Sequence, residues 1–262
     1  MAAGDALLAL PRLVGSAALG MGTDVGGMTL LSGRILARLL PPRLDRYELV
    51  RNLHRMGNQS VPIVVITAVF VGGIMVIQAA PSVERFNGVD IIGGMAGTTT
   101  VRELGPLLIA LMFSGRVGAK NTAELGTMTV TDQIDALRAL AIDPLAYLVV
   151  PRVVAMVIML FVLTILGDLV ALCGAVVVSE ALIDVGPRTF WNSLIVFVEP
   201  WDVWTGLLKS IVFGVMIAVT SCHFGLSVKG GAPGVGRAVN AAVVAAASGV
   251  FVLDYFSTYL LK

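Results

Sequence analysis

Four long apolar segments constrain this chain more than any other feature of its sequence. A helix that crosses the hydrocarbon core of a bilayer needs about 20 mostly apolar residues, and such segments lie at 61–80, 153–178, 206–228 and 239–261. A shorter one, 104–119, extends backward through the Gly- and Thr-rich residues 94–100, which packed membrane helices tolerate. With 57% apolar and 13% charged residues, the chain is predicted to be an all-α integral membrane protein with five transmembrane helices.

The basic residues are distributed unevenly between the two sides of such an arrangement. Thirteen of the 18 Lys and Arg residues fall in three alternate connections: the segment before the first span, residues 115–152 and residues 225–238. Cytoplasmic connections carry the excess of Lys and Arg in membrane proteins. The bias predicts a multi-pass protein of the cell inner membrane with a cytoplasmic N-terminus and a periplasmic C-terminus.

The first 58 residues are predicted to form a cytoplasmic and interfacial helical segment. Within residues 28–40, a helix places Arg34 and Arg38 on one side and an apolar stripe on another, which suits a helix lying in the membrane interface. The alternative is a sixth, short span, which the two arginines disfavour. Residues 59–262 then form the membrane domain, with spans at about 61–80, 94–119, 148–178, 206–228 and 239–261.

A polar, patterned segment follows the second predicted span. We expect a cytoplasmic coupling helix over about 120–143, in which Thr129 and Asp132 form a capping pair, Asp135 and Arg138 share a face, and Glu124 adds a further acid. Acidic side chains would face an anionic leaflet unfavourably. A protein partner is therefore favoured over a helix resting on lipid. Asp143 and Pro144 are predicted to begin the next helix.

Five ionisable residues fall at similar depth in the outer half of the predicted spans. They are Arg102, Glu103, Asp168, Lys209 and Asp254. Because charges in lipid are costly unless they are paired or face water, the shared depth predicts a polar site that could receive a lipid headgroup. Asp168 and Asp254 are also explained as hydrogen-bond partners between helices.

The sequence offers no catalytic pattern. His54 and His223 lack the spacing of a zinc helix, and no serine sits in a nucleophile elbow, so a membrane hydrolase is a weak alternative. Residues 231–238 have the glycine spacing of a P-loop, but Arg237 and Ala238 replace its Lys and Ser or Thr. We interpret them as a flexible cytoplasmic turn. Cys173 and Cys222 lie in apolar runs and are not expected to form a structural disulfide. No basic cluster suggests nucleic acid.

Several polar motifs resemble those of the MlaE/YrbE permease family over about residues 50–262. They include Arg-Glu-Leu-Gly-Pro (102–106), Gly-Arg-Val-Gly (115–118), Ala-Glu-Leu-Gly-Thr-Met (123–128), Asp-Gln-Ile-Asp-Ala-Leu (132–137), Asp-Pro (143–144), Val-Pro-Arg (150–152), Gly-Val-Gly-Arg-Ala (234–238) and Val-Leu-Asp-Tyr-Phe (252–256). The resemblance implies the membrane subunit of a lipid ABC transporter, in which the matching Arg102, Glu103 and Lys209 border the lipid cavity.

The resemblance also implies partners. They are a second permease copy, a cytoplasmic MlaF-like ATPase held by the coupling helix, a periplasmic MlaD-like protein with an MCE domain and, in some such systems, a MlaB-like STAS protein. ATP and Mg²⁺ would be used by the ATPase, and this chain would be a non-catalytic subunit without a cofactor. Lipids, with phospholipids as the expected class, would be the cargo.

Three other functions stay open at this point. An ion-coupled secondary transporter would use Asp168 and Asp254 as coupling carboxylates. A small-solute ABC permease would share the coupling helix, and a scaffold would bind partners without transport. The sequence does not distinguish inward from outward movement of cargo, or a homodimer from a heterodimer.

Overall fold

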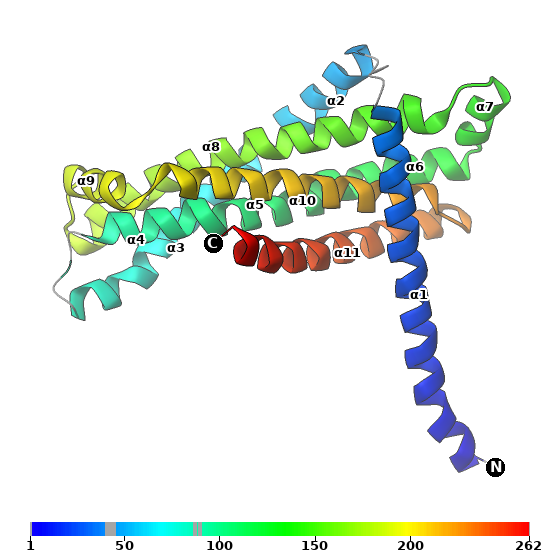
Figure 1. The fold of residues 1–262 in the computed structure, drawn as a ribbon, viewed down its shortest axis with the longest axis horizontal. Helices are drawn as coiled ribbons and strands as arrows, with labels where there is room; N and C mark the ends of the chain where they lie inside the picture. The colour runs from blue at the N-terminus through cyan, green and yellow to red at the C-terminus, as the bar shows by residue number, and fades with distance from the viewer. Residues whose placement is uncertain (1, 40–45, 86–87, 89–90, 262) are drawn as a thin grey trace.

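The computed structural model describes residues 2–39, 46–85, 88 and 91–261, and these residues contain helices and turns but no strand. Four helical segments in these ranges are long and apolar enough to cross a membrane: Val61–Pro81, Leu145–Ile183, Pro200–Leu226 and Gly231–Leu260. They belong to α3 (Val61–Arg85), η4 with α8 (Leu145–Val149 and Val150–Ile183), α10 (Pro200–Leu226) and α11 (Gly231–Leu260). These helices run along the long axis of the molecule (Figure 1). The all-α membrane class is confirmed.

The second predicted span is a helical rod in five consecutive pieces. α4 (Ile92–Thr99), η2 (Thr100–Leu104), α5 (Gly105–Phe113), η3 (Ser114–Gly118) and α6 (Ala119–Val130) follow one another without a gap, and η2 and η3 are π-helical. No single α-helix in this rod has the length of a span, so the fifth crossing stays a prediction. π-helical turns often occur at functional sites, and here η2 carries Arg102 and Glu103.

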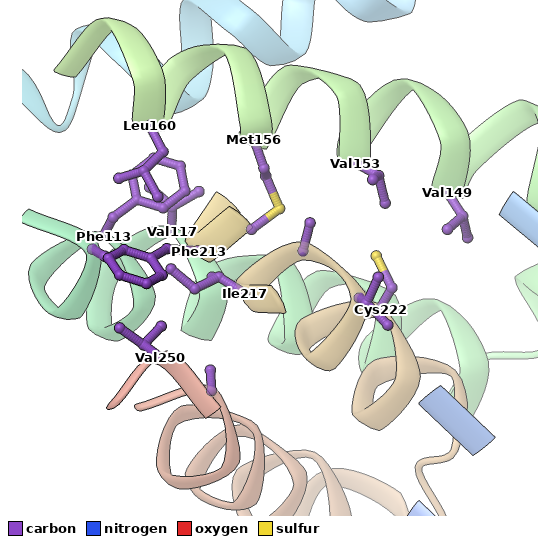
Figure 2. Close-up of a cluster of buried hydrophobic side chains, with 14 of the residues drawn as sticks. Phe113, Val117, Val149, Val153, Met156, Leu160, Phe213, Ile217, Cys222 and Val250 are labelled. Atoms are coloured by element: carbon purple, nitrogen blue, oxygen red, sulfur yellow. The ribbon is translucent and has the colours of Figure 1, made fainter. Parts of the chain in front are cut away.

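The core lies where α5, α8, α10 and α11 meet. Figure 2 shows Phe113 on α5, Leu160 on α8, Phe213 on α10 and Val250 on α11 turned toward a common interior. Each of these side chains is at most 1% exposed. Because apolar burial adds no driving force between helices in lipid, such interfaces depend on close packing. The core therefore fixes the positions of the helices that carry the polar residues described below.

Glycines bring α3 and α8 into direct backbone contact. A Cβ atom on Gly72 would overlap the carbonyl oxygen of Ala171, and one on Gly174 would lie 2.5 Å from the carbonyl oxygen of Val69. Small residues allow this close approach of membrane helices.

The N-terminal segment contains two helices. α1 (Ala2–Leu39) is much longer than the predicted interfacial helix over 28–40, and it is followed by α2 (Arg46–Asn58). The predicted apolar face is present, because Leu31 and Ile35 are buried in the core cluster. α1 crosses the bundle near the end that carries α7, at a steep angle to its long axis (Figure 1). α1 is not among the four candidate spans of the described residues.

The predicted coupling helix over 120–143 is divided. α6 continues to Val130 and α7 (Gln133–Ala139) begins after a turn in which Asp132 has a left-handed φ of 56°. The predicted capping pair is wrong: Thr129 lies inside α6, where its hydroxyl donates to the Leu125 carbonyl at 2.9 Å, and Asp132 makes no side-chain cap. Asp143 is placed as expected, since its Oδ1 accepts a hydrogen bond from the Leu145 N–H at 3.0 Å.

Two further differences concern short segments. Residues 231–238 form the first turns of α11 and are not the flexible turn that we expected; the chain turns earlier, at Gly230, where φ is 87°. α9 (Pro187–Phe197) was not predicted, because its eleven residues are too short and too amphipathic to read as a span. It packs on α4, where Ser193 Oγ accepts a hydrogen bond from the Gly94 N–H at 3.0 Å.

Candidate functional site

Three helical elements bring four polar side chains together inside the bundle. Lys209 on α10 lies with its Nζ 2.5 Å from Glu103 Oε2 on η2 and 3.0 Å from Asp254 Oδ1 on α11. The hydroxyl of Thr258, one turn after Asp254, accepts a hydrogen bond from Lys209 at 2.8 Å and lies 3.1 Å from Glu103 Oε1. We call Glu103, Lys209, Asp254 and Thr258 the charged cluster.

The members of the charged cluster differ in accessibility. The Lys209 side chain has no exposed surface, whereas the side chains of Asp254 and Glu103 are 17% and 30% exposed. A buried ammonium is stable only when anions compensate it, so Lys209 holds the two carboxylates together. Asp254 Oδ1 is near the ammonium but makes no hydrogen bond. Glu103 is therefore the member best placed to offer an oxygen to a ligand.

Arg102 forms an ion pair with a residue outside the charged cluster. Its Nη1 lies 3.1 Å from Asp202 Oδ1 in the first turn of α10. The other oxygen of Asp202 accepts a hydrogen bond from the Glu199 N–H at 3.1 Å, as part of a capping box. Asp202 was not predicted, because the usual capping box has Ser or Thr first and Glu or Gln three residues later, whereas Glu199 and Asp202 take these positions here.

Asp168 stands apart from the charged cluster. It is buried on α8 against Gly105, at the junction of η2 and α5, and its Oδ1 has no hydrogen-bond partner among the described residues. Of the five residues predicted to share one site, the structure joins Glu103, Lys209 and Asp254, pairs Arg102 with Asp202, and leaves Asp168 separate.

The residues predicted for coupling lie at the other end of the rod. Glu124 on α6 lies 2.8 Å from Arg55 on α2 and 3.5 Å from Arg152 on α8. Asp135 and Arg138 form the predicted pair on α7, at 2.8 Å, with both side chains about two-thirds exposed. Thr129, Asp135 and Arg138 also line a groove of about 430 Å³ between α1, α7 and the end of α10.

α1 is tied to this region by an ion pair. Arg38 Nε lies 2.6 Å from Asp143 Oδ2, just before η4. Partial burial raises the pKa of the Asp143 carboxyl, but hydrogen bonds from Arg38 and Leu145 and the Arg38 charge outweigh it and lower the pKa below its ordinary value. Asp143 is therefore ionised at neutral pH.

The described residues contain no group of three His, Cys, Asp or Glu side chains that could hold a metal ion. Cys173 and Cys222 are both free thiols. Cys222 is buried near Asn121, whose Nδ2 donates to its sulfur at 3.3 Å, whereas Cys173 is exposed on α8.

The apolar helices and the charged cluster between them define a multi-pass membrane protein with a polar site inside its bundle. Comparison with known proteins identifies its family: the family model Permease MlaE matches residues 49–260. The chain belongs to the MlaE permease family, as its motifs predicted.

Individual relatives agree with this assignment. A probable ABC transporter permease of Synechocystis is 41% identical over 88% of both chains. A probable ABC transporter permease of Rickettsia prowazekii is 36% identical over 97% of this chain and 98% of its own. The Arabidopsis chloroplast protein named trigalactosyldiacylglycerol 1 is 34% identical over 86% of this chain and 65% of its own. The chain is thus a permease subunit of the ABC transporter class.

Proposed function

We propose that this chain is the permease of a lipid ABC transporter and that the charged cluster contacts the lipid headgroup. The observation that carries this proposal is a partly exposed carboxylate, Glu103, anchored by a fully buried ammonium within a membrane bundle. Intramembrane ionisable residues usually mark substrate pathways. Nearby residues of α11, including Phe251, Val252 and Tyr255, expose large apolar side chains that suit acyl chains.

The name of one relative supports a lipid as cargo. The name of the Arabidopsis relative contains that of a glycerolipid, trigalactosyldiacylglycerol. A diacyl lipid joins a polar headgroup to two apolar tails, which matches a charged cluster flanked by exposed apolar helix faces. Phospholipid is the class that we favour.

The energy source would be a separate protein. A cytoplasmic MlaF-like ATPase would bind ATP and Mg²⁺ and engage the surface that contains Glu124, Thr129, Asp132, Asp135 and Arg138. A periplasmic MCE protein would exchange lipid with the permease, a second permease copy would complete the cavity, and a STAS protein would join in some assemblies. In this arrangement the chain would lie in the inner membrane, with its N-terminus in the cytoplasm.

The helical rod offers a route for coupling. α6 carries Glu124, and the same rod continues through η3 and α5 to Glu103 on η2. Movement of α6 and α7 by the ATPase would therefore displace Glu103 relative to Lys209 on α10. Separating these two residues would uncover the charged cluster, and bringing them together would expel a bound headgroup.

A reconstituted vesicle assay tests this proposal. With the partner ATPase and the MCE protein present, lipid transfer should require ATP, and Glu103→Gln should slow it roughly 10- to 150-fold, the value of a hydrogen bond to a charged group. Glu180→Gln removes an exposed carboxylate near the end of α8 and should leave transfer unchanged. Normal transfer by Glu103→Gln would remove Glu103 from the lipid site.

The unpaired Asp168 favours one alternative, a secondary transporter in which this carboxylate binds the coupling ion. That function needs no ATPase. Transport by the chain alone in vesicles with an ion gradient, abolished by Asp168→Asn, would support it against the proposal above. Identification of lipid extracted with the purified protein would also separate a lipid permease from a permease for small solutes.

A further inference from the structure

A groove with several basic side chains lies on the outside of the bundle between α2, α6 and the start of α8. It consists of two adjoining hollows that share Asn52, Arg55 and Glu124. The larger, of about 560 Å³, is lined by Arg51 and Arg152, and a shallow one of about 20 Å³ beside it is lined by Arg116 and Lys120. We call the two hollows together the basic groove. None of its basic residues belongs to the charged cluster around Lys209.

Cations outnumber acids in the basic groove. Its lining contains Arg51, Arg55, Arg116, Lys120 and Arg152 but only two acids, Glu48 and Glu124. The acids are already engaged, because Glu48 lies 3.2 Å from Arg51, and Glu124 lies between Arg55 and Arg152. With five cations and two acids, the lining of the groove has a net charge of +3.

Two of these cations are available to a ligand. Within the described part of the chain, the exposed Arg116 guanidinium on η3 has neither a hydrogen bond nor an ion pair. Lys120, one turn further along the rod, donates only to the neutral amide oxygen of Gln59, at 2.8 Å. An anion between them would gain charge-assisted hydrogen bonds without breaking an existing ion pair.

The position of the basic groove suggests where such an anion would come from. α2 lies beside the half of α8 that is nearer to α7, and α7 extends beyond it at the end of the molecule (Figure 1). The groove is thus set back from the end where a soluble partner would meet α7. α2 exposes Tyr47 and Val50, at 74% and 63%, beside its charged residues, a composition typical of a helix in the headgroup layer.

We propose that the basic groove binds the phosphate of an anionic phospholipid from the leaflet nearer to α7. Basic pockets beside membrane helices recognise anionic headgroups in this way. Met128 and Leu148, which also line the groove, provide apolar contacts for the start of the acyl chains. This lipid is distinct from the cargo proposed above, because the charged cluster lies in the opposite half of the bundle. Lys209 follows the start of α10 near α9, whereas Arg152 follows the start of α8 near α7.

Native mass spectrometry of the delipidated full chain tests the proposal. Phosphatidylglycerol should bind more tightly than phosphatidylcholine with the same acyl chains, and added salt should weaken it. The double variant Arg116→Gln with Lys120→Gln should lower the affinity for phosphatidylglycerol roughly 25-fold, about fivefold for each cation. Its affinity for phosphatidylcholine should change little.

A matched control uses Lys229→Gln with Arg237→Gln, which removes two exposed cations outside the basic groove. This variant should bind phosphatidylglycerol like the unaltered chain. Equal loss in both double variants, or equal affinity of the unaltered chain for the two lipids, would overturn the proposal. So would displacement of phosphatidylglycerol by inorganic phosphate at an ionic strength at which chloride leaves the lipid bound, because the site would then be one for a free anion. Loss of the lipid when a purified ATPase partner binds would also overturn it, because the groove would then be a protein interface. None of these outcomes depends on whether Glu103 contacts cargo.

Discussion

Lys209 Nζ lies 2.5 Å from Glu103 Oε2, and the two residues come from helices that are 106 positions apart in the sequence. Glu103 is on the rod that continues into α6, whereas Lys209 is on α10. The pair therefore links the element that carries the predicted coupling residues to the core of the bundle. A change in this contact is the simplest way for an event at α6 to reach the charged cluster.

Removing only the Lys209 ammonium should destabilise the folded protein more than removing all three charges of the charged cluster. Lys209→Met leaves Glu103 and Asp254 facing each other without compensation, which we expect to lower the free energy of unfolding by about 3–5 kcal/mol, toward the lower limit because Glu103 is partly exposed. Denaturant unfolding in detergent measures this loss. Adding Glu103→Gln and Asp254→Asn to Lys209→Met should recover part of it, and an unaltered midpoint for the single variant would contradict the observed ion pairs.

The contact between α3 and α8 should tolerate no added side chain at Gly72. In Gly72→Ala the new methyl group overlaps the backbone carbonyl of Ala171, which cannot rotate away, so we expect a loss of about 1–3 kcal/mol. Gly236→Ala is the matched control, because a Cβ atom there meets nothing within 4 Å. Thermal unfolding should separate the two variants, and equal midpoints would mean that α3 and α8 lie further apart than described.

The ion pair between Arg38 and Asp143 should respond to acid. The pKa of Asp143 is below its ordinary value of 3.8, so the carboxylate stabilises the folded protein fully above the unfolded pKa and this contribution is lost as pH falls through the folded pKa. Spin labels at Leu36→Cys and Leu140→Cys, with Cys173 and Cys222 replaced by alanine, should report a constant distance between α1 and α7 at neutral pH and a broader distribution only in strong acid.

Arg38→Gln provides the comparison for this acid response. Without the guanidinium, the pKa of Asp143 should return toward its ordinary value, so the broadening should begin at a higher pH. A distance distribution that changes identically with pH in both forms would show that the ion pair does not hold α1 in place.

Hydropathy was sufficient to predict the four long apolar helices, because the membrane requires such helices and leaves few alternatives. It also placed Glu103, Lys209 and Asp254 at one depth, since the rise of a helix is constant. It could not predict which of them meet, because rotation about each helix axis depends on packing such as that of Gly72 on α8. For the same reason Arg102 was not assigned to Asp202.

Local irregularities of the helices could not be predicted from the sequence, for a different physical reason. The π-helical turns at 100–104 and 114–118 show no distinctive composition. They pack on distant helices, the first on α8 and α10 and the second on α10 and α11. The turn at Asp132 uses a left-handed backbone conformation that Asp adopts at modest cost. The sequence pattern around Asp132 is that of a continuous helix, so it does not indicate a turn. The spacing of Thr129 and Asp132 matches a capping motif only by coincidence.

The orientation of the bundle can be tested at Asp135, whose side chain is 68% exposed on α7. The positive-inside bias predicts that α7 faces the cytoplasm. In a chain lacking Cys173 and Cys222, Asp135→Cys should react with a membrane-impermeant maleimide only after the inner membrane is permeabilised. Arg188→Cys, exposed on α9 at the opposite end of the bundle, should react without permeabilisation. The reverse pattern would invert the topology, place the basic groove in the outer leaflet and remove the α6–α7 surface from reach of a cytoplasmic ATPase.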